Sequence, residues 1–285
     1  MVDFSRTAAI PGFDDSGAQT LQRHQENSVV YYQFESLRAY RNLIHGVFTR
    51  LGGASLPPFS TLNLGRAVGD ADEAVEENYV RVCRTLGIPR GSLVTGHQTH
   101  SDHVAVVGIE DRGRMLPQTD GLVTHAPGVC LTLRFADCVP LLFLDPRKNV
   151  IALTHAGWKG TLKKIGSKTV QVLRTQYGSQ AEDIIACIGP SIGPCCYQVG
   201  QDVIDAVRGT FPGSSEGLLL RQNNGAVHLD LWAANRLLLE EEGVTHVESA
   251  GICTSCRRAE FFSHRGDRGR TGRFGVFMAL EDSGG

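Results

Sequence analysis

The 285-residue sequence lacks an excess of charge of either sign and lacks any long apolar run. Its 28 basic and 30 acidic residues give a formal net charge of −2, which provides no general attraction for nucleic acid or an anionic membrane. No apolar segment approaches the roughly 20 residues of a membrane span, and the first residues lack the pattern of a secretory signal. We therefore expect a soluble, cytoplasmic protein with no nucleic-acid, membrane or obligate protein partner.

Cysteine is also sparse, since eight residues in a chain of this length are too few for a disulfide scaffold. Free cysteine is most often a buried core residue, so a core position is the default interpretation for each of them. His-x-His pairs are absent, although an oxidase with several copper ions would need many of them. The sequence therefore argues against a three-copper centre.

What the chain does contain is a regular alternation of short apolar segments and amphipathic helical patterns. The patterns predict strands over residues 29–34, 128–133, 139–144, 150–154 and 183–188, and helices over 71–86, 162–177, 202–211 and 230–242. Residues 1–27 show no sustained period, so we expect a loosely ordered tail followed by one catalytic domain over 28–285. The predicted fold class is α/β (mixed α+β), with a compact mixed β-sheet core flanked by amphipathic helices.

Three segments carry residues suited to metal chemistry. His155 follows a predicted buried strand and precedes a helix, and the small residues around it would let a ligand come close to the backbone. Cys138, preceded by Asp137, lies between two apolar strands, where a cation or a metal would lower its pKa. Each residue also has a plain structural interpretation, His155 as a turn histidine and Cys138 as a core thiol.

The third segment places three histidines, His97, His100 and His103, within seven residues. On a strand His97 and His103 would share one face and His100 would take the other, so one ligand from this group is expected rather than three. Two histidines and a thiolate from separate strand ends would leave one coordination position open, as in a catalytic zinc site. A hydrolase with Cys138 as nucleophile and His155 as base is the alternative from the residues alone.

Two further loops contain cysteines, Cys195-Cys196 in one and Cys253-x-x-Cys256 in the other. A four-cysteine structural zinc that uses both loops is possible. We predict that Cys253 and Cys256 do not form a zinc knuckle, because no second pair has matching spacing and Cys195 and Cys196 are adjacent. The segment 262–273 supplies four arginines among glycines, which could bind an anion or form a solvated basic loop.

Taken together, these segments resemble the laccase-domain family, whose members were first called multicopper polyphenol oxidases and are now described as zinc-dependent purine nucleoside phosphorylases. The match runs from about His45 to Phe277. The motifs that carry it are 45–53, 62–65, 98–100, 120–124, 136–140, 155–161, 189–192, 195–197, 262–263 and 271–273.

The resemblance implies a metal site of His100, Cys138 and His155, which are also the expected catalytic residues. It implies Zn²⁺ as cofactor, and copper could occupy such a site in vitro. It further implies phosphorolysis of adenosine, inosine and 5′-methylthioadenosine, with adenosine deamination at the same site. We expect purine nucleosides and phosphate as the small-molecule partners, and the predicted binding residues are Arg50, Asn63, Gln98, Arg265 and Arg273. Editing of cell-wall precursors by a cysteine-dependent hydrolase and copper-dependent polyphenol oxidation are the alternative activities.

Overall fold

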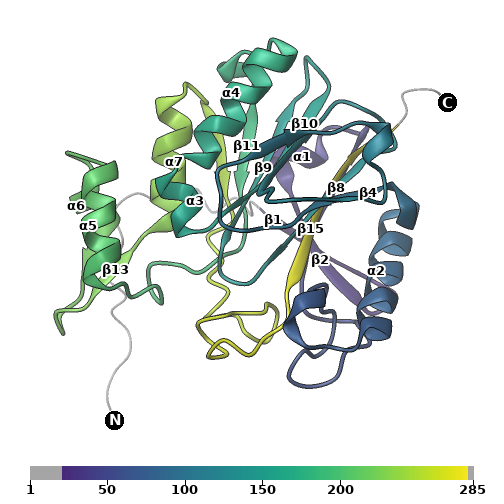
Figure 1. Cartoon of the computed structure of the whole chain (residues 1–285), viewed down its shortest axis with the longest axis horizontal. Helices are drawn as coiled ribbons and strands as arrows, with labels where there is room; N and C mark the ends of the chain where they lie inside the picture. Colours follow the sequence, from purple (N-terminus) through teal and green to yellow (C-terminus); the bar gives the residue numbers. More distant parts are fainter. Residues whose placement is uncertain (1–20, 282–285) are drawn as a thin grey trace.

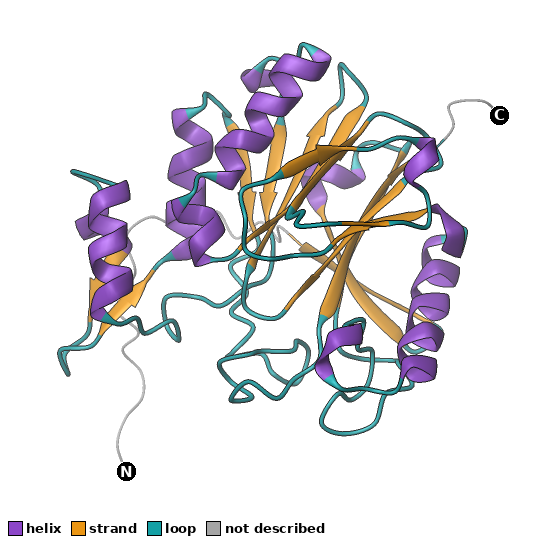
Figure 2. Ribbon diagram, in the orientation of Figure 1, coloured by secondary structure: helices purple, strands orange, loops and turns teal. Residues whose placement is uncertain are grey.

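Two β-sheets packed face to face form the centre of the molecule, and helices cover their outer faces (Figures 1 and 2). The computed structural model describes residues 21–281. The first sheet has the order β1-β2-β3-β15-β8-β4-β6 and the second β14-β11-β9-β10-β7-β5, while β12 and β13 form a separate pair. Both large sheets mix parallel and antiparallel neighbours.

The strands of the first sheet are β1 (Leu21–Glu26), β2 (Val29–Phe34), β3 (Leu43–Phe48), β4 (Leu93–Gly96), β6 (Met115–Leu116), β8 (Cys130–Phe135) and β15 (Phe274–Leu280). Those of the second sheet are β5 (Val104–Val106), β7 (Gly121–Thr124), β9 (Val139–Asp145), β10 (Val150–Ala156), β11 (Ile185–Ile188) and β14 (His246–Ser249). The small pair is β12 (Leu219–Arg221) and β13 (Val227–Leu229). The helices are α1 (Glu35–Arg38), α2 (Asp72–Leu86), α3 (Trp158–Leu162), α4 (Ile165–Tyr177), α5 (Gln201–Thr210), α6 (Ser215–Leu218) and α7 (Leu231–Glu241).

Strand β9 shows how the sequence builds these layers. Its apolar side chains alternate between the two faces of the sheet, as the two-residue period of a strand requires. Leu142 and Leu144 enter the core between the sheets, whereas Leu141 and Phe143 enter the core beneath α4 and α7. Complete burial of each side chain contributes about 1.5–3 kcal/mol, so both faces of the strand stabilise the fold.

Helix α2 covers the outer face of the first sheet through Val75, Tyr79 and Val82, which recur at helical spacing. Acidic residues occupy its first turn, as the helix dipole favours. Gly87 ends the helix in the left-handed conformation, at φ 67°, which glycine adopts without steric cost.

The predicted mixed fold is confirmed, and two local predictions need correction. Residues 21–26 do not belong to a loose tail, because they form β1 and pair with β2 in antiparallel register; residues 1–20 of that prediction lie outside the described part of the chain. The helix predicted over 162–177 begins only at Ile165, as α4, since Lys164 adopts a left-handed conformation at φ 59°; Leu162 is instead the last residue of α3. Within residues 21–281 no helix has the length and apolar character to cross a membrane.

Candidate active site

Three segments that are distant in sequence meet where the two sheets approach each other. His100 lies in the loop after β4, Cys138 in the turn between β8 and β9, and His155 near the end of β10. The turn at Cys138 passes from one sheet to the other, because β8 and β9 belong to different sheets. The potential ligand atoms of the three residues lie within 4.8 Å of one another, and Cys138 Sγ is 3.6 Å from His100 Nε2. We call this group the triad.

Asp120 holds two members of the triad in place. Its buried carboxylate accepts hydrogen bonds from the backbone amides of Thr99, His100 and Ser101, which fixes the loop that carries His100. One carboxylate oxygen also lies 2.8 Å from His155 Nδ1. A histidine whose Nδ1 donates to a carboxylate presents Nε2 to a metal, as is usual for metal-ligating histidines.

The electrostatics of the triad favour a charged pair. Burial raises the pKa of the Cys138 thiol, but the charge of His155 and a hydrogen bond with His100 outweigh it and lower that pKa to about 6. Burial lowers the pKa of His155, but Cys138 and Asp120 raise it to about 9. These shifts favour a thiolate beside an imidazolium, and a metal ion would displace the proton from His155.

The residues present fit a zinc or copper ion. Two imidazole nitrogens and one thiolate are ligands that both metals accept, and three protein ligands leave one position of a tetrahedral zinc open. Gly157 leaves room beside the ligands, since a Cβ at this position would lie 2.8 Å from both Cys138 Sγ and His100 Cδ2. Position 157, two residues after His155, must therefore be glycine for the three side chains to approach one another.

The triad lies in the wall of a cavity of about 590 Å³. The cavity is lined by aromatic side chains, Trp158 and Tyr197, and by cationic ones that include Arg134, Arg265 and Arg273. In the described part of the chain, these three guanidinium groups donate to backbone carbonyls rather than to carboxylates. Their positive charge therefore remains available to an anionic ligand.

Comparisons with known proteins identify the family of the chain. A family model described as "Multi-copper polyphenol oxidoreductase laccase" matches residues 44–281. The chain belongs to this family. It is 40% identical to the purine nucleoside phosphorylase YlmD of Geobacillus stearothermophilus, over 85% of this chain and 92% of that protein. It is 32% identical to the mouse purine nucleoside phosphorylase LACC1, over 85% of this chain and 56% of that protein. The crystal structure of YlmD from Geobacillus stearothermophilus superposes with a TM-score of 0.87 at 36% identity and covers 93% of this chain and 100% of that one.

Several residues that the sequence and the family resemblance single out do face the cavity. Gln98, Arg265 and Arg273 line it together with the triad, and so does His97. Gln98 exchanges two hydrogen bonds with the backbone of Arg134, which fixes its amide at the cavity wall. His103 instead places Nδ1 3.2 Å from the hydroxyl of Thr119.

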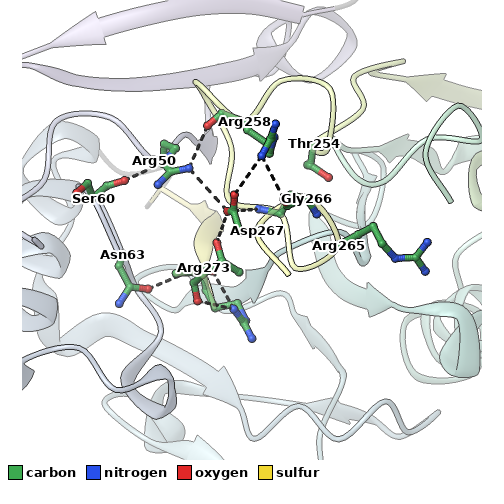
Figure 3. A network of polar contacts seen from close by, with 12 residues as sticks. Arg50, Ser60, Asn63, Thr254, Arg258, Arg265, Gly266, Asp267 and Arg273 are labelled. Carbon is green, nitrogen blue, oxygen red and sulfur yellow. Dashed lines mark hydrogen bonds and ion pairs between the residues drawn. The ribbon is translucent and has the colours of Figure 1, made fainter. Parts of the chain in front are cut away.

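Arg50 does not line the cavity. Figure 3 shows its polar contacts instead. Its Nε donates to the carbonyl of Ser60 at 2.8 Å and its Nη1 to the carbonyl of Arg258 at 3.0 Å. The guanidinium also stacks on Phe262 and lies 3.9 Å from a carboxylate oxygen of Asp267. These contacts favour a role for Arg50 in joining two loops.

Asn63 holds the backbone of residues beside the cavity. It is buried, and its Oδ1 accepts hydrogen bonds from the backbone amides of Gly65 at 2.9 Å and Arg273 at 2.8 Å. Figure 3 shows the contact between Asn63 and Arg273. Asn63 therefore positions the backbone of a cavity residue without lining the cavity itself.

Sequence reasoning did not assign a role to Asp120 or Arg134. Asp120 opens a motif of the family, but nothing local indicates that its carboxylate reaches the loop at residues 99–101. Arg134 lies in β8 among buried apolar residues, and its position there gives no sign that it faces a cavity.

Four of the other cysteines lie close together in the structure. The thiols of Cys195, Cys196, Cys253 and Cys256 lie within 4.8 Å of one another. The adjacency of Cys195 and Cys196 therefore does not keep the two loops from forming one ligand set, so this reason against a zinc knuckle is wrong. We call this group the four-cysteine cluster.

Proposed function

We propose that the chain is a zinc-dependent purine nucleoside phosphorylase that cleaves adenosine, inosine and 5′-methylthioadenosine with phosphate and also deaminates adenosine. The observation that carries the proposal is the position of the triad, in the wall of a cavity that also presents arginines and aromatic rings. The relatives named purine nucleoside phosphorylase support the same reaction class.

The cavity suits both substrates. Trp158 and Tyr197 offer flat apolar surfaces on which a purine can pack. Arg134, Arg265 and Arg273 offer guanidinium groups, which match phosphate oxygens in charge and geometry. Phosphorolysis requires phosphate to reach the ribose C1′ while the bond to the base breaks, so these cations would orient the phosphate and stabilise its charge.

The triad would hold the cofactor. Zinc bound by His100, Cys138 and His155 would supply Lewis-acid chemistry at the cavity wall. Asp120 would keep His155 in the tautomer and orientation that binding needs. Ile192 and Leu231 contribute apolar surface to the remaining lining, which would shield one side of the substrate from bulk water.

The test is turnover of adenosine by purified, zinc-loaded protein, followed by chromatography with and without phosphate. We expect adenine and ribose 1-phosphate only when phosphate is present, and inosine with ammonia in either case. Cys138→Ala serves as the control without a complete triad. Failure to release adenine in the presence of phosphate would contradict the phosphorylase assignment.

One observation favours a second candidate, a cysteine-dependent hydrolase of cell-wall precursors. The thiolate of Cys138 beside His155 is the arrangement of an activated thiol nucleophile. Metal analysis separates the two activities, because a hydrolase of this kind would be active without metal and inactivated by alkylation of Cys138. Copper-dependent polyphenol oxidation is tested separately, by adding a phenol to copper-loaded protein.

A further inference from the structure

The four-cysteine cluster is assembled by the topology of the second sheet. Strands β11 and β14 pair in parallel, with Ile188 opposite Ser249. Parallel neighbours end at the same edge of a sheet, so the loops that follow them start side by side. One loop carries Cys195 and Cys196, and the other carries Cys253 and Cys256.

The distances between the sulfur atoms match a metal site better than a disulfide. Cys256 Sγ lies 3.5 Å from Cys195 Sγ and 3.4 Å from Cys196 Sγ. A disulfide bond would need a separation of about 2.05 Å. Four sulfurs at about 2.3 Å from a tetrahedral zinc are about 3.8 Å apart, and all four sulfurs here lie within 4.8 Å of one another.

Backbone contacts hold the two loops in this arrangement. Ser191 and Cys253 form a parallel bridge, and the amide of Thr254 donates to the carbonyl of Ser191 at 3.0 Å. The amide of Gly193 donates to Cys253 Sγ at 3.2 Å. An amide aimed at sulfur stabilises a thiolate, which is the form that binds metal. Gly193 is itself packed tightly, since a Cβ there would lie 2.6 Å from the ring of Trp232.

We propose that Cys195, Cys196, Cys253 and Cys256 bind a second zinc ion with a structural role. Four thiolates complete the coordination of zinc and leave no position for substrate, which distinguishes structural from catalytic sites. The proposal does not depend on the proposed activity of the triad.

The bound zinc would stabilise a wall of the cavity. The first loop supplies Ile192 and Tyr197 to the lining, and the second continues into the segment that supplies Arg265. The second loop also contacts the triad turn directly, because the Thr254 hydroxyl donates to a carboxylate oxygen of Asp137 at 2.7 Å. Asp137 precedes Cys138 in the chain and has a positive φ of 81°, a conformation that such contacts must maintain.

The proposal is tested by the zinc content of four proteins purified under reducing conditions. We expect two zinc ions per chain in the wild type and one in Cys138→Ala and in Cys256→Ser. Cys83→Ala is the matched control, since Cys83 is a buried thiol outside both groups, and it should retain two zinc ions. A wild-type protein with one zinc, lost in Cys138→Ala and kept in Cys256→Ser, would overturn the proposal.

Cobalt provides a readout that does not require Cys256→Ser to fold. The Cys138→Ala protein retains all four cysteines of the cluster, so after cobalt loading we expect thiolate-to-cobalt charge transfer and the intense d–d bands of a tetrahedral site. Absence of these bands in folded Cys138→Ala would overturn the proposal. So would peptide mapping of the reduced, zinc-supplemented wild type that recovered Cys256 in a disulfide with Cys195 or Cys196.

Discussion

The triad and the four-cysteine cluster both contain cysteine, yet their surroundings differ. The triad combines one thiol with two imidazoles, is held by a buried carboxylate and faces a cavity. The cluster consists of four thiols on two loops, and Cys195 and Cys256 are exposed to solvent. Hydrogen bonds from Thr254 and from the amide of Ile192 to Asp137 connect the two regions.

This difference indicates which features assign a role to a potential metal site. Three ligands would leave a coordination position open, and the cavity beside the triad would give a substrate access to that position. Four ligands close the coordination shell, so the cluster can only tie its loops together. The number of ligands and the space beside them therefore separate catalysis from structure more clearly than the presence of cysteine does.

The largest effect is expected from Cys138→Ala, which removes a ligand from the triad only. We expect phosphorolysis of adenosine to fall by more than about a hundredfold, because loss of even an outer-shell partner commonly costs 10–100-fold. The far-ultraviolet circular dichroism spectrum should be unchanged, since the side chain is small and lines a cavity. A folded variant with full activity and full zinc content would show that the triad is not the active metal site.

Asp120→Asn addresses the feature that the cluster lacks, a carboxylate that orients a ligand. We expect the affinity of the triad for zinc to fall by about 10–100-fold, measured by competition with a chelator. The amide cannot accept from His155 and from the backbone amides of residues 99–101 as the carboxylate does. The zinc of the four-cysteine cluster should be unaffected, and equal weakening at both sites would indicate a general loss of structure.

Arg265→Ala and Arg50→Ala compare a cation in the cavity with one outside it. We expect Arg265→Ala to raise the KM for phosphate by about tenfold or more, since a hydrogen bond to a charged group contributes about 1.5–3 kcal/mol. Arg50→Ala should instead lower the thermal stability, because Arg50 joins two loops. Deamination of adenosine needs no phosphate and serves as the internal control in both variants. A raised KM for phosphate in Arg50→Ala alone would support the sequence-based prediction that Arg50 binds phosphate and contradict the role inferred from the cavity.

A smaller effect on stability is expected from His45. Like His155, it is a buried histidine of the described chain with a strongly shifted pKa, but its pKa is lowered. Burial lowers the pKa of His45 to about 3, and its Nε2 accepts from the amide of Phe34. The folded state therefore resists protonation, so stability is complete above the unfolded pKa of about 6.5 and is lost as pH falls toward 3. We expect His45 to contribute a slope of about 1.4 kcal/mol per pH unit in this window. Urea unfolding at several pH values should show a shallower slope in His45→Gln, and an unchanged slope would mean that His45 is not the group responsible.

The parts of the fold that the sequence could predict are those with a sustained apolar pattern. Strand β9 is an apolar run that is buried on both faces, and helix α2 has one apolar face. The predicted bounds of both elements differ from the observed ones by one residue. Strand β1 escaped prediction because it is a polar edge strand, with no apolar alternation over residues 21–26. Its structure depends on pairing with β2, which local sequence does not reveal.

The triad and the four-cysteine cluster also differ in how far the sequence predicts them. The residues of the triad were assigned by family motifs, since His100 and Cys138 are 38 positions apart and only the packing of two sheets brings them together. The proximity of the four cysteines was not predicted, because Cys196 and Cys256 are 60 positions apart and meet through the parallel pairing of β11 and β14. A pattern within one loop cannot report on a partner that a sheet places beside it.

The most direct test of a zinc-dependent phosphorylase is to restore zinc to chelated protein and to follow adenine release from adenosine. Adenine release should require both zinc and phosphate, and it should return in the wild type as zinc is added. It should stay absent in Cys138→Ala and return in Cys83→Ala. Adenine release by metal-free protein, or release that does not depend on phosphate, would contradict the proposed function.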